Sequence, residues 1–432
     1  MKKVLIITYY WPPMGGGGVQ RWLKMTKYFR ENGWEPVIFT TEGAEISIHD
    51  ESLLKEVPEG IEVIKVPIWE PFNVYKKLLG KKKNEKINPG FLQESNSNSR
   101  LQKLAIWVRG NMFIPDAKKY WIKPASKALN KYLKANPVDA IVSTGPPHTN
   151  HLIAQKALNG FSIPWVVDFR DPWTNIDFYD QLMLSNWADK KHKRLEQSVL
   201  KQATEVVTVS WSWANDFERL SGRKIKVITN GYDPADFTDQ KVSLDEKFTF
   251  THVGSMNADR HPKQFIEALA EVIQENKEIA KHLVLKFIGP VDIQIMNHLK
   301  ERNLFQYVEH IPSLPHQKVI AHIQSAQVLL LPLNDVPNID GVLPGKLYEY
   351  LGAKRPIFCI GKLTGDAGKI IQETNAGVIN GFEDKIGMKN VIMGMFRSYM
   401  QHDLVVNSDK IAKFSRQELA KSYCEMLSGI TG

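Results

Sequence analysis

The pattern of apolar and polar positions in the first forty residues predicts a strand, a turn, a helix and a second strand. Residues 4–7 form a short continuous apolar run, as expected for a strand buried on both faces of a parallel sheet. A turn rich in proline and glycine follows at residues 11–18. Apolar residues then recur at mostly helical spacing over 19–32, up to an Asn-Gly pair typical of a helix end. Residues 37–40 are the second strand, so the chain begins as a βαβ unit.

The alternation of strands and helices continues along the first half of the chain. Further strands are expected at residues 61–66, 139–144, 165–168, 205–209 and 226–229. Helices are expected between members of this series, at about 148–158 and 188–202. Strands separated by helices favour a doubly wound parallel sheet.

The same pattern restarts after the polar and acidic residues 234–247, which we interpret as a linker. A strand at 248–254 and a helix at about 262–275 open this second series. Its later strands are expected at residues 283–289, 308–311, 328–331 and 357–360. The predicted fold class is therefore α/β, with two Rossmann-like domains. We expect these domains, and a C-terminal helix that packs back on the first, at residues 1–233, 248–407 and 408–432.

Residues 72–123 break the alternation. They contain a lysine-rich stretch at 75–83, then polar residues, then an apolar stretch with a tryptophan at 101–108. Such a basic, aromatic-bearing insertion suits the headgroup layer of an acidic membrane. An ordinary surface loop followed by a helix packed on the core explains the pattern equally well.

Length, cysteine content and the length of the apolar runs limit the number of domains and the cellular compartment to be expected. A chain of 432 residues is long enough for two or three domains. Its two cysteines, Cys359 and Cys424, form neither a disulfide framework nor a zinc site, so a reducing cytoplasm is the expected compartment. No segment approaches the roughly 20 apolar residues that span a bilayer. The apolar run that follows Met1 is too short for a signal peptide and lacks a cleavage site.

The positive charge is concentrated in the first part of the chain. The net charge is +9, and residues 1–170 alone carry 25 Lys and Arg against 15 Asp and Glu. Anionic partners are therefore expected: a phosphate-bearing substrate, an acidic lipid surface or a nucleic acid. The alternative is that these residues only solubilise one face.

The glycine turn between the first strand and the first helix is a candidate phosphate-binding loop. Backbone N–H groups at Gly16 and Gly17 can approach phosphate oxygens closely at a helix N-terminus. The turn lacks both the G-x-G-x-x-G spacing and a Walker lysine. Glu42 ends the second strand, where a dinucleotide fold places its ribose-binding acid, so an NAD-type site stays open. A tight turn without a ligand is the third possibility.

The second half contains a stronger candidate for a diphosphate site. Gly345 opens a predicted helix and Lys346 lies in its first turn, so a diphosphate there would gain the helix dipole and a lysine charge together. Glu349 lies on the same helix face and can accept both hydroxyls of a ribose. A simple ion pair between Lys346 and Glu349 on a solvated helix is the alternative.

The sequence resembles GT-B fold glycosyltransferases of the retaining family 4 type over nearly its whole length. Four stretches carry the resemblance, of which the second and fourth are the more specific: residues 7–13, 227–233, 253–254 with the following helix, and 344–351. The resemblance implies that the two Rossmann-like domains face a central cleft, with a nucleotide sugar bound by the C-terminal domain and the acceptor by the N-terminal domain. It also implies transfer with retention of configuration, a hexosyltransferase-like activity, and no metal or cofactor.

The resemblance assigns donor-site roles with two departures. Glu349 matches the second of two family glutamates, whereas the first falls at Gly341, so backbone amides of residues 341–345 are expected to contact the donor sugar instead. Gly254 ends the strand, and Ser255 stands where an arginine is common. Lys263 fits the family lysine, and we expect Arg260 or Lys346 to supply the missing charge to the leaving diphosphate.

The acceptor site is expected at the end of the strand at 165–168. Asp168, Arg170 and Asp171 form a charged turn there that can orient an acceptor hydroxyl or phosphate. His148 is a further candidate, with a helix-capping or structural histidine as the alternative.

The resemblance also implies a cellular setting and partners. It suggests a lipid-linked saccharide acceptor in bacterial surface-polysaccharide synthesis, a peripheral position on the inner face of the membrane, and no nucleic acid partner. A non-catalytic nucleotide-sugar-binding module and an NAD-dependent oxidoreductase remain alternative functions.

Overall fold

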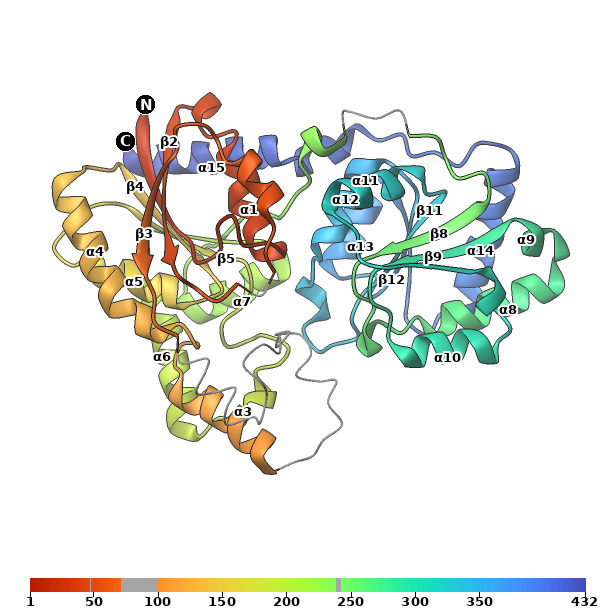
Figure 1. Cartoon of the computed structure of the whole chain (residues 1–432), viewed down its shortest axis with the longest axis horizontal. Helices are drawn as coiled ribbons and strands as arrows, with labels where there is room; N and C mark the ends of the chain where they lie inside the picture. Colours follow the sequence, from red (N-terminus) through yellow and green to blue (C-terminus); the bar gives the residue numbers. More distant parts are fainter. Residues whose placement is uncertain (47, 71–99, 238–241) are drawn as a thin grey trace. The chain divides into compact units, whose positions relative to one another are not determined.

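A computed structural model describes residues 1–46, 48–70, 100–237 and 242–432, with side chains in the helix that begins at Arg100 described from Lys103 onward. The chain divides into two compact units, residues 1–229 with 420–432 (unit 1) and residues 230–419 (unit 2). Each unit is built on one parallel sheet with helices, so the prediction of two Rossmann-like α/β domains is confirmed (Figure 1). The lysine-rich stretch 75–83 lies outside the described residues.

Unit 1 contains a seven-stranded sheet in the order β3-β2-β1-β4-β5-β6-β7, with parallel neighbours throughout. Its strands are β1 Lys2–Ile7, β2 Trp34–Glu42, β3 Glu62–Pro67, β4 Ala140–Gly145, β5 Trp165–Phe169, β6 Glu205–Thr208 and β7 Lys226–Val227. Its helices are α1 Gly17–Thr26, α3 Arg100–Met112, α4 Ile122–Ala135, α5 Thr149–Ala157, α6 Asn186–Gln202 and α7 Trp211–Ser221. The strand order reverses between β1 and β4, so the segments that follow these two strands meet at the switch point of the sheet.

Unit 2 contains a six-stranded parallel sheet in the order β10-β9-β8-β11-β12-β13. Its strands are β8 Phe248–Val253, β9 Leu283–Ile288, β10 Val308–Ile311, β11 Val328–Pro332, β12 Ile357–Ile360 and β13 Gly377–Asn380. Its helices are α8 Lys263–Glu275, α9 Lys277–His282, α10 Ile293–Glu301, α11 His316–Ser325, α12 Gly345–Ala353, α13 Asp366–Thr374 and α14 Lys385–Met400. The switch point of this sheet lies between β8 and β11.

Alternate residues of the central strands of unit 2 enter two separate cores. Leu330 and Phe358 pack into a core shared with α8, α10 and α14, whereas their neighbours Leu329 and Ile357 pack into a core shared with α11, α12 and α13. Figure 1 shows these two groups of helices on the two faces of the sheet. Because both faces are covered, the strands read as continuous apolar runs in the sequence.

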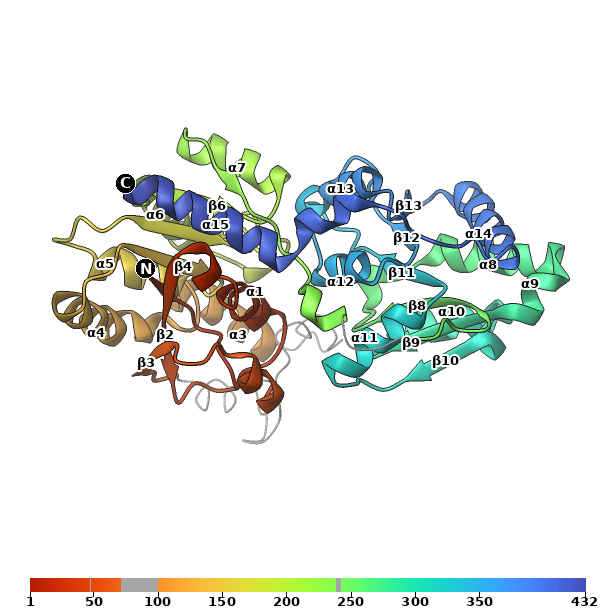
Figure 2. The ribbon, with the colours of Figure 1, turned by 90° about the horizontal axis from the view of Figure 1, so that it is seen from above.

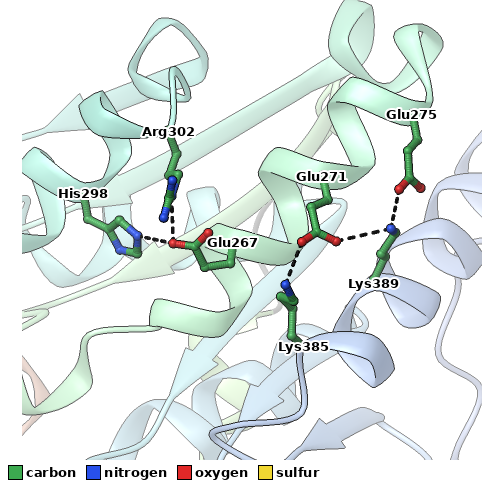
Figure 3. Close-up of polar contacts among 7 residues, drawn as sticks. All are labelled: Glu267, Glu271, Glu275, His298, Arg302, Lys385 and Lys389. Atoms are coloured by element: carbon green, nitrogen blue, oxygen red, sulfur yellow. Dashed lines mark hydrogen bonds and ion pairs between the residues drawn. The ribbon is translucent and has the colours of Figure 1, made fainter.

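Acidic residues on successive turns of α8 pair with the two neighbouring helices (Figure 3). Glu267 accepts from Arg302, whose Nε lies 2.8 Å away, and Glu271 accepts from Lys385 Nζ at 2.7 Å. Glu275 pairs with Lys389 at 2.5 Å. These pairs are open to solvent, so they add little to the free energy of unfolding compared with the apolar core. Their main effect is on how the helices line up beside one another.

The helix α15, Arg416–Thr431, ends on unit 1. The ring of Tyr423 meets that of Trp22 edge to face at 5.1 Å, and Trp34 Nε1 donates to Ser428 Oγ at 3.2 Å. Lys2 Nζ donates to Thr431 Oγ1 at 2.9 Å, so the two termini lie side by side (Figures 1 and 2). The described part of the expected linker, residues 234–237 and 242–247, belongs to unit 2.

Two elements are shorter than predicted. The helix α1 ends at Thr26, and a separate 3-10 turn follows at 30–32, closed by Gly33 with φ of 81°. The strand β7 has only two residues. The N–H of Ile228 still donates to Thr208 O of β6 at 2.9 Å, but the carbonyls of Ile228 and Thr229 accept from the Arg21 guanidinium, at 2.9 and 2.7 Å, so the pairing stops there. Within the described residues, no helix combines the length and the apolar character that crossing a bilayer requires.

Candidate active site

The segments that follow β8 and β11 bring the predicted donor-site residues of unit 2 together. The strand β8 runs into Gly254 and Ser255, and Arg260 lies in a short 3-10 turn further on. The strand β11 leads, after a loop, into α12, which begins at Gly345. In open α/β sheets, ligands bind outside the carboxyl ends of the strands at such a switch point.

Two cations converge on one backbone carbonyl at this edge. Arg260 Nη1 donates to Ser255 O at 2.9 Å, and Lys346 Nζ lies 3.4 Å from the same oxygen. Arg260 is also fixed by Asn334, whose Oδ1 accepts from Nε at 2.5 Å. Among the described residues, no carboxylate lies within ion-pair distance of either cation.

Burial and the nearby Arg260 lower the pKa of Lys346 well below its usual range, and burial lowers the pKa of Arg260. A site with two uncompensated cations favours an anionic ligand.

Gly254 lies at the end of β8 beside the lysine amine. A Cβ at this position would lie 3.5 Å from both Nζ and Cε of Lys346, which is an ordinary contact distance. Its φ of +80° is therefore what favours glycine here. Gly289, with φ of +117°, packs closely on Gly254 itself, because its Cβ would stand 3.0 Å from Gly254 O.

The N-terminus of α12 is open to an anion. No side chain caps it, and its first turn contains no acidic residue. The first N–H groups of a helix have no intrahelical acceptor, so those of Gly345 and Lys346 are available to a ligand. The amides of Gly341 and Val342 already donate to Asn338 O and Ile339 O, both at 3.2 Å. These two amides are therefore engaged within the turn, and the contact of the 341–345 amides with the donor sugar stays a prediction.

Glu349 lies one turn after Lys346 on the same helix, and its side chain is partly exposed. Its Oε1 is 3.9 Å from His316 Nδ1, and His316 Nε2 is 3.3 Å from Asp236 Oδ2. Burial raises the pKa of Glu349, and His316 partly offsets that rise. In the described structure, Glu349 and Lys346 form no ion pair within 4.0 Å. The alternative of a simple Lys346–Glu349 ion pair on a solvated helix is therefore not observed.

Lys263 is not gathered with this group. Its side chain is exposed at the first residue of α8, and it lines a hollow of about 420 Å³ between α8 and α10. The other residues of that hollow are His261, Gln264, Glu267, Gln294, His298 and Glu301. Its assignment to the diphosphate stays a prediction from the resemblance.

In unit 1, Asp168 is fully buried and bonded by three side chains. Arg21 donates to it from Nη2 at 2.9 Å and from Nε at 3.2 Å. Trp22 Nε1 and Thr144 Oγ1 also donate, at 3.1 and 2.8 Å. With both oxygens engaged by the protein, this geometry favours a structural role for Asp168 over the predicted catalytic one.

Arg170 contacts the glycine turn, and Asp171 follows it in the sequence. Arg170 donates to Gly18 O at 2.9 Å and to Pro146 O, and it lies over the ring of Tyr10 at 5.8 Å. Burial lowers the pKa of Arg170 and raises that of Asp171. Arg170 therefore joins the segments after β1 and β4 at the switch point of this sheet.

The predicted glycines lie at the start of α1, which carries no side-chain cap. Gly16 precedes the helix with φ of 89°, and Gly17 is its exposed first residue. These two glycines belong to unit 1, whereas Lys346 and Glu349 belong to unit 2.

His148 is buried, with 7% of its surface exposed. Its ring stacks on that of Trp173 at 4.7 Å, and its Nδ1 has no hydrogen-bond partner among the described residues. Burial, with His151 and His192 nearby, lowers the pKa of His148 well below its usual range. The side chain makes no capping bond to α5, so the helix-capping alternative is wrong.

Three residues of these sites carried no sequence signal. His252 and Tyr350 lie inside apolar elements and are buried, and the Tyr350 hydroxyl accepts from Val253 N at 3.2 Å at the end of β8. Arg21 is buried on α1 among mostly apolar residues, and nothing in its spacing points to Asp168. A single sequence does not relate residues so far apart.

Comparison with known proteins finds a family model that matches part of the chain. Residues 91–231 match the family model described as a glycosyl transferase 4-like domain. No protein among the curated sequences matches the chain.

Solved structures resemble the chain over almost its whole length. Sucrose-phosphate synthase from Thermosynechococcus elongatus has a TM-score of 0.63 at 12% identity, covering 100% of this chain and 99% of that one. HepE from Anabaena in complex with UDP-glucose gives 0.62 at 13%, covering 99% and 100%. WaaG, a glycosyltransferase involved in lipopolysaccharide biosynthesis, gives 0.52 at 14%, covering 99% and 97%. At these identities the likeness shows the fold, which is that of the GT-B glycosyltransferases.

Proposed function

We propose that this chain is a retaining glycosyltransferase that uses a nucleoside-diphosphate sugar as its donor. Its GT-B fold and its glycosyl transferase 4-like segment support this proposal. The proposed activity is hexosyltransferase-like and independent of metal. The proposed acceptor is a saccharide, carried on a lipid, in surface-polysaccharide synthesis. One observation carries the proposal: Lys346 and Arg260 converge, without a carboxylate partner among the described residues, beside the uncapped N-terminus of α12.

The proposed chemistry follows from where charge develops. As the sugar leaves, the nucleoside diphosphate gains negative charge, and fixed donors aimed at it lower the barrier by about 3–4 kcal/mol each. Lys346, Arg260 and the Gly345 amide are placed to act in this way. Glu349 would accept the ribose hydroxyls, and His148 with Arg170 and Asp171 would contact the acceptor.

Thermal denaturation with a panel of nucleotides tests the proposal. UDP or GDP at 100 times its Kd should stabilise the native state by about 2.7 kcal/mol, whereas NADH should not. Release of free nucleotide from the matching sugar donor then separates an enzyme from a non-catalytic binding module. A chain stabilised by NADH alone would contradict the proposal.

Replacement of Glu349 by glutamine should separate the ribose contact from the diphosphate contact. We expect nucleoside diphosphate to bind about tenfold more weakly, because a carboxylate hydrogen bond is lost. Inorganic pyrophosphate should bind as it does to the unchanged protein, since it has no ribose. Titration calorimetry with both ligands measures this, and equal losses for the two would contradict the assignment.

We also propose that an acidic membrane is a partner of this chain. Trp187 is 63% exposed at the start of α6, with Lys191 Nζ over its ring at 4.7 Å. Trp107 on α3 is 41% exposed, and Asn111 of this helix bonds both Met183 O and Ser185 N, so α3 and the start of α6 are neighbours. Exposed tryptophans beside lysines suit the headgroup region of an anionic bilayer.

Co-sedimentation with lipid vesicles checks this membrane surface. We expect the double variant Trp187→Ser/Lys191→Ser to bind phosphatidylglycerol vesicles at least about threefold more weakly, since it removes one cation and one interfacial aromatic. The control Trp211→Ser removes an exposed tryptophan of α7 and should bind normally. Equal binding to neutral phosphatidylcholine vesicles would contradict an electrostatic membrane contact.

A further inference from the structure

A histidine that the sequence did not single out lies directly behind the proposed diphosphate-binding lysine. His252 is the penultimate residue of β8, with 0% of its surface exposed. Its imidazole lies 3.0 Å from the carbonyl oxygen of Leu330 and 3.0 Å from the amine of Lys346. The chemistry of these two partners determines the state of the ring.

The first partner fixes the position of the ring proton. His252 Nδ1 lies 3.0 Å from Leu330 O in the paired strand β11. A carbonyl oxygen can only accept, so Nδ1 carries the hydrogen and donates it. The other nitrogen, Nε2, is then a lone-pair acceptor if the ring is neutral. Burial lowers the pKa of His252 well below its usual range, and Lys346 lowers it further, so the ring is neutral at physiological pH.

The second partner is the amine of Lys346. Its Nζ donates to His252 Nε2 at 3.0 Å and lies 3.4 Å from Ser255 O. A bound diphosphate opposes the lowering of the Lys346 pKa and favours the ammonium form. The ammonium has three donors, so these two contacts leave one for the ligand. They also hold the end of a long flexible side chain at one place over Gly254, which reduces the entropy that the ligand would otherwise have to remove.

A neutral acceptor suits this position better than a carboxylate. An aspartate or glutamate in place of His252 would pair with Lys346 and compete with the diphosphate for it. The imidazole lone pair orients the amine but leaves its charge uncompensated. The same logic explains why Arg260 is held by an amide oxygen, Asn334 Oδ1, and by a backbone carbonyl.

We infer that His252 is a positioning residue, which aims the Lys346 ammonium at the diphosphate of the donor as a neutral hydrogen-bond acceptor. This inference rests on the proposed function, because it takes the ligand at Lys346 to be a diphosphate. His252 itself does not contact the substrate.

Binding of three ligands to three variants tests the inference. His252→Leu removes the acceptor, whereas His252→Gln keeps an acceptor oxygen near the position of Nε2. Thr251→Val is the matched control, because Thr251 is a buried neighbour in the same strand whose hydroxyl has no hydrogen-bond partner among the described residues. The ligands are the nucleoside diphosphate that the unchanged protein binds (UDP or GDP), the corresponding nucleoside and inorganic pyrophosphate.

The expected pattern is specific to phosphate. His252→Leu should bind the nucleoside diphosphate and pyrophosphate about tenfold more weakly, as for loss of an oriented charge-assisted hydrogen bond, and bind the nucleoside normally. His252→Gln should stay within about threefold of the unchanged protein, and Thr251→Val should match it. A merely structural role for His252 would weaken all three ligands together.

Two results overturn the inference, and they are distinguishable. If the unchanged protein binds a nucleoside diphosphate and His252→Leu binds it equally well, the positioning role is wrong and the proposed function stands. If the unchanged protein binds neither UDP, GDP nor pyrophosphate, the proposed function fails and the inference fails with it.

Discussion

Replacement of Lys346 by methionine should lower the rate of sugar transfer by about 10²–10³-fold, as removal of one donor to a developing oxyanion does. The methionine side chain keeps the apolar stem of the lysine and removes only the ammonium. Because Lys346 is only partly buried, the fold should tolerate the change. Steady-state kinetics with the donor that the protein accepts provide the measurement, and the loss should appear in kcat as well as in kcat/KM.

Lys369→Met is the matched control for this variant. Lys369 is a lysine of α13 in the same unit, with an exposed side chain that pairs only with Asp366 at 3.3 Å among the described residues. It should retain the activity of the unchanged protein. A Lys346→Met enzyme that keeps more than about half of its activity would show that the leaving group is stabilised elsewhere.

Replacement of Asp168 by alanine should destabilise unit 1 by about 3–5 kcal/mol, the usual cost of removing one partner of a buried ion pair. Arg21 has 1% of its side chain exposed and would keep its charge after losing the carboxylate of Asp168. The carbonyls of Ile228 and Thr229 would remain its acceptors. Urea denaturation followed by tryptophan fluorescence measures the change.

A double-mutant comparison identifies the cause of this loss. Arg21→Met/Asp168→Leu replaces both charges with apolar groups of similar size, so it should be more stable than Asp168→Ala. Asp177→Asn changes an exposed aspartate nearby in the sequence and should stay within about 0.5 kcal/mol of the unchanged protein. If Asp168→Ala lost sugar transfer without losing stability, the catalytic role predicted from the sequence would be restored.

The arrangement of strands was predictable because both sheets are parallel and covered on both faces. Apolar runs such as 328–331 and 357–360 stand out in the sequence for this reason, and they form β11 and β12. The final strand, β13 (Gly377–Asn380), was missed because it is short and not continuously apolar. The length of β7 could not be predicted, because it depends on Arg21, a residue far away in the chain.

The candidate site was predictable only where its residues are neighbours in sequence. Lys346 and Glu349 share one helical turn, so their common face follows from helix geometry alone. The contact between Lys346 and His252 spans 94 positions, and that between Arg21 and Asp168 spans 147. Spacing within one sequence holds no information about such long-range pairs. These pairs nevertheless determine which charged side chains remain available to a ligand.

The central claim is that a nucleoside diphosphate binds at the start of α12. A crystal structure of the chain with the bound nucleoside diphosphate, UDP or GDP, tests it most directly. The account predicts phosphate oxygens within hydrogen-bonding distance of Lys346 Nζ and of the Gly345 amide, with the ribose beside Glu349. A nucleotide bound instead at the glycine turn of α1, with α12 unoccupied, would contradict it.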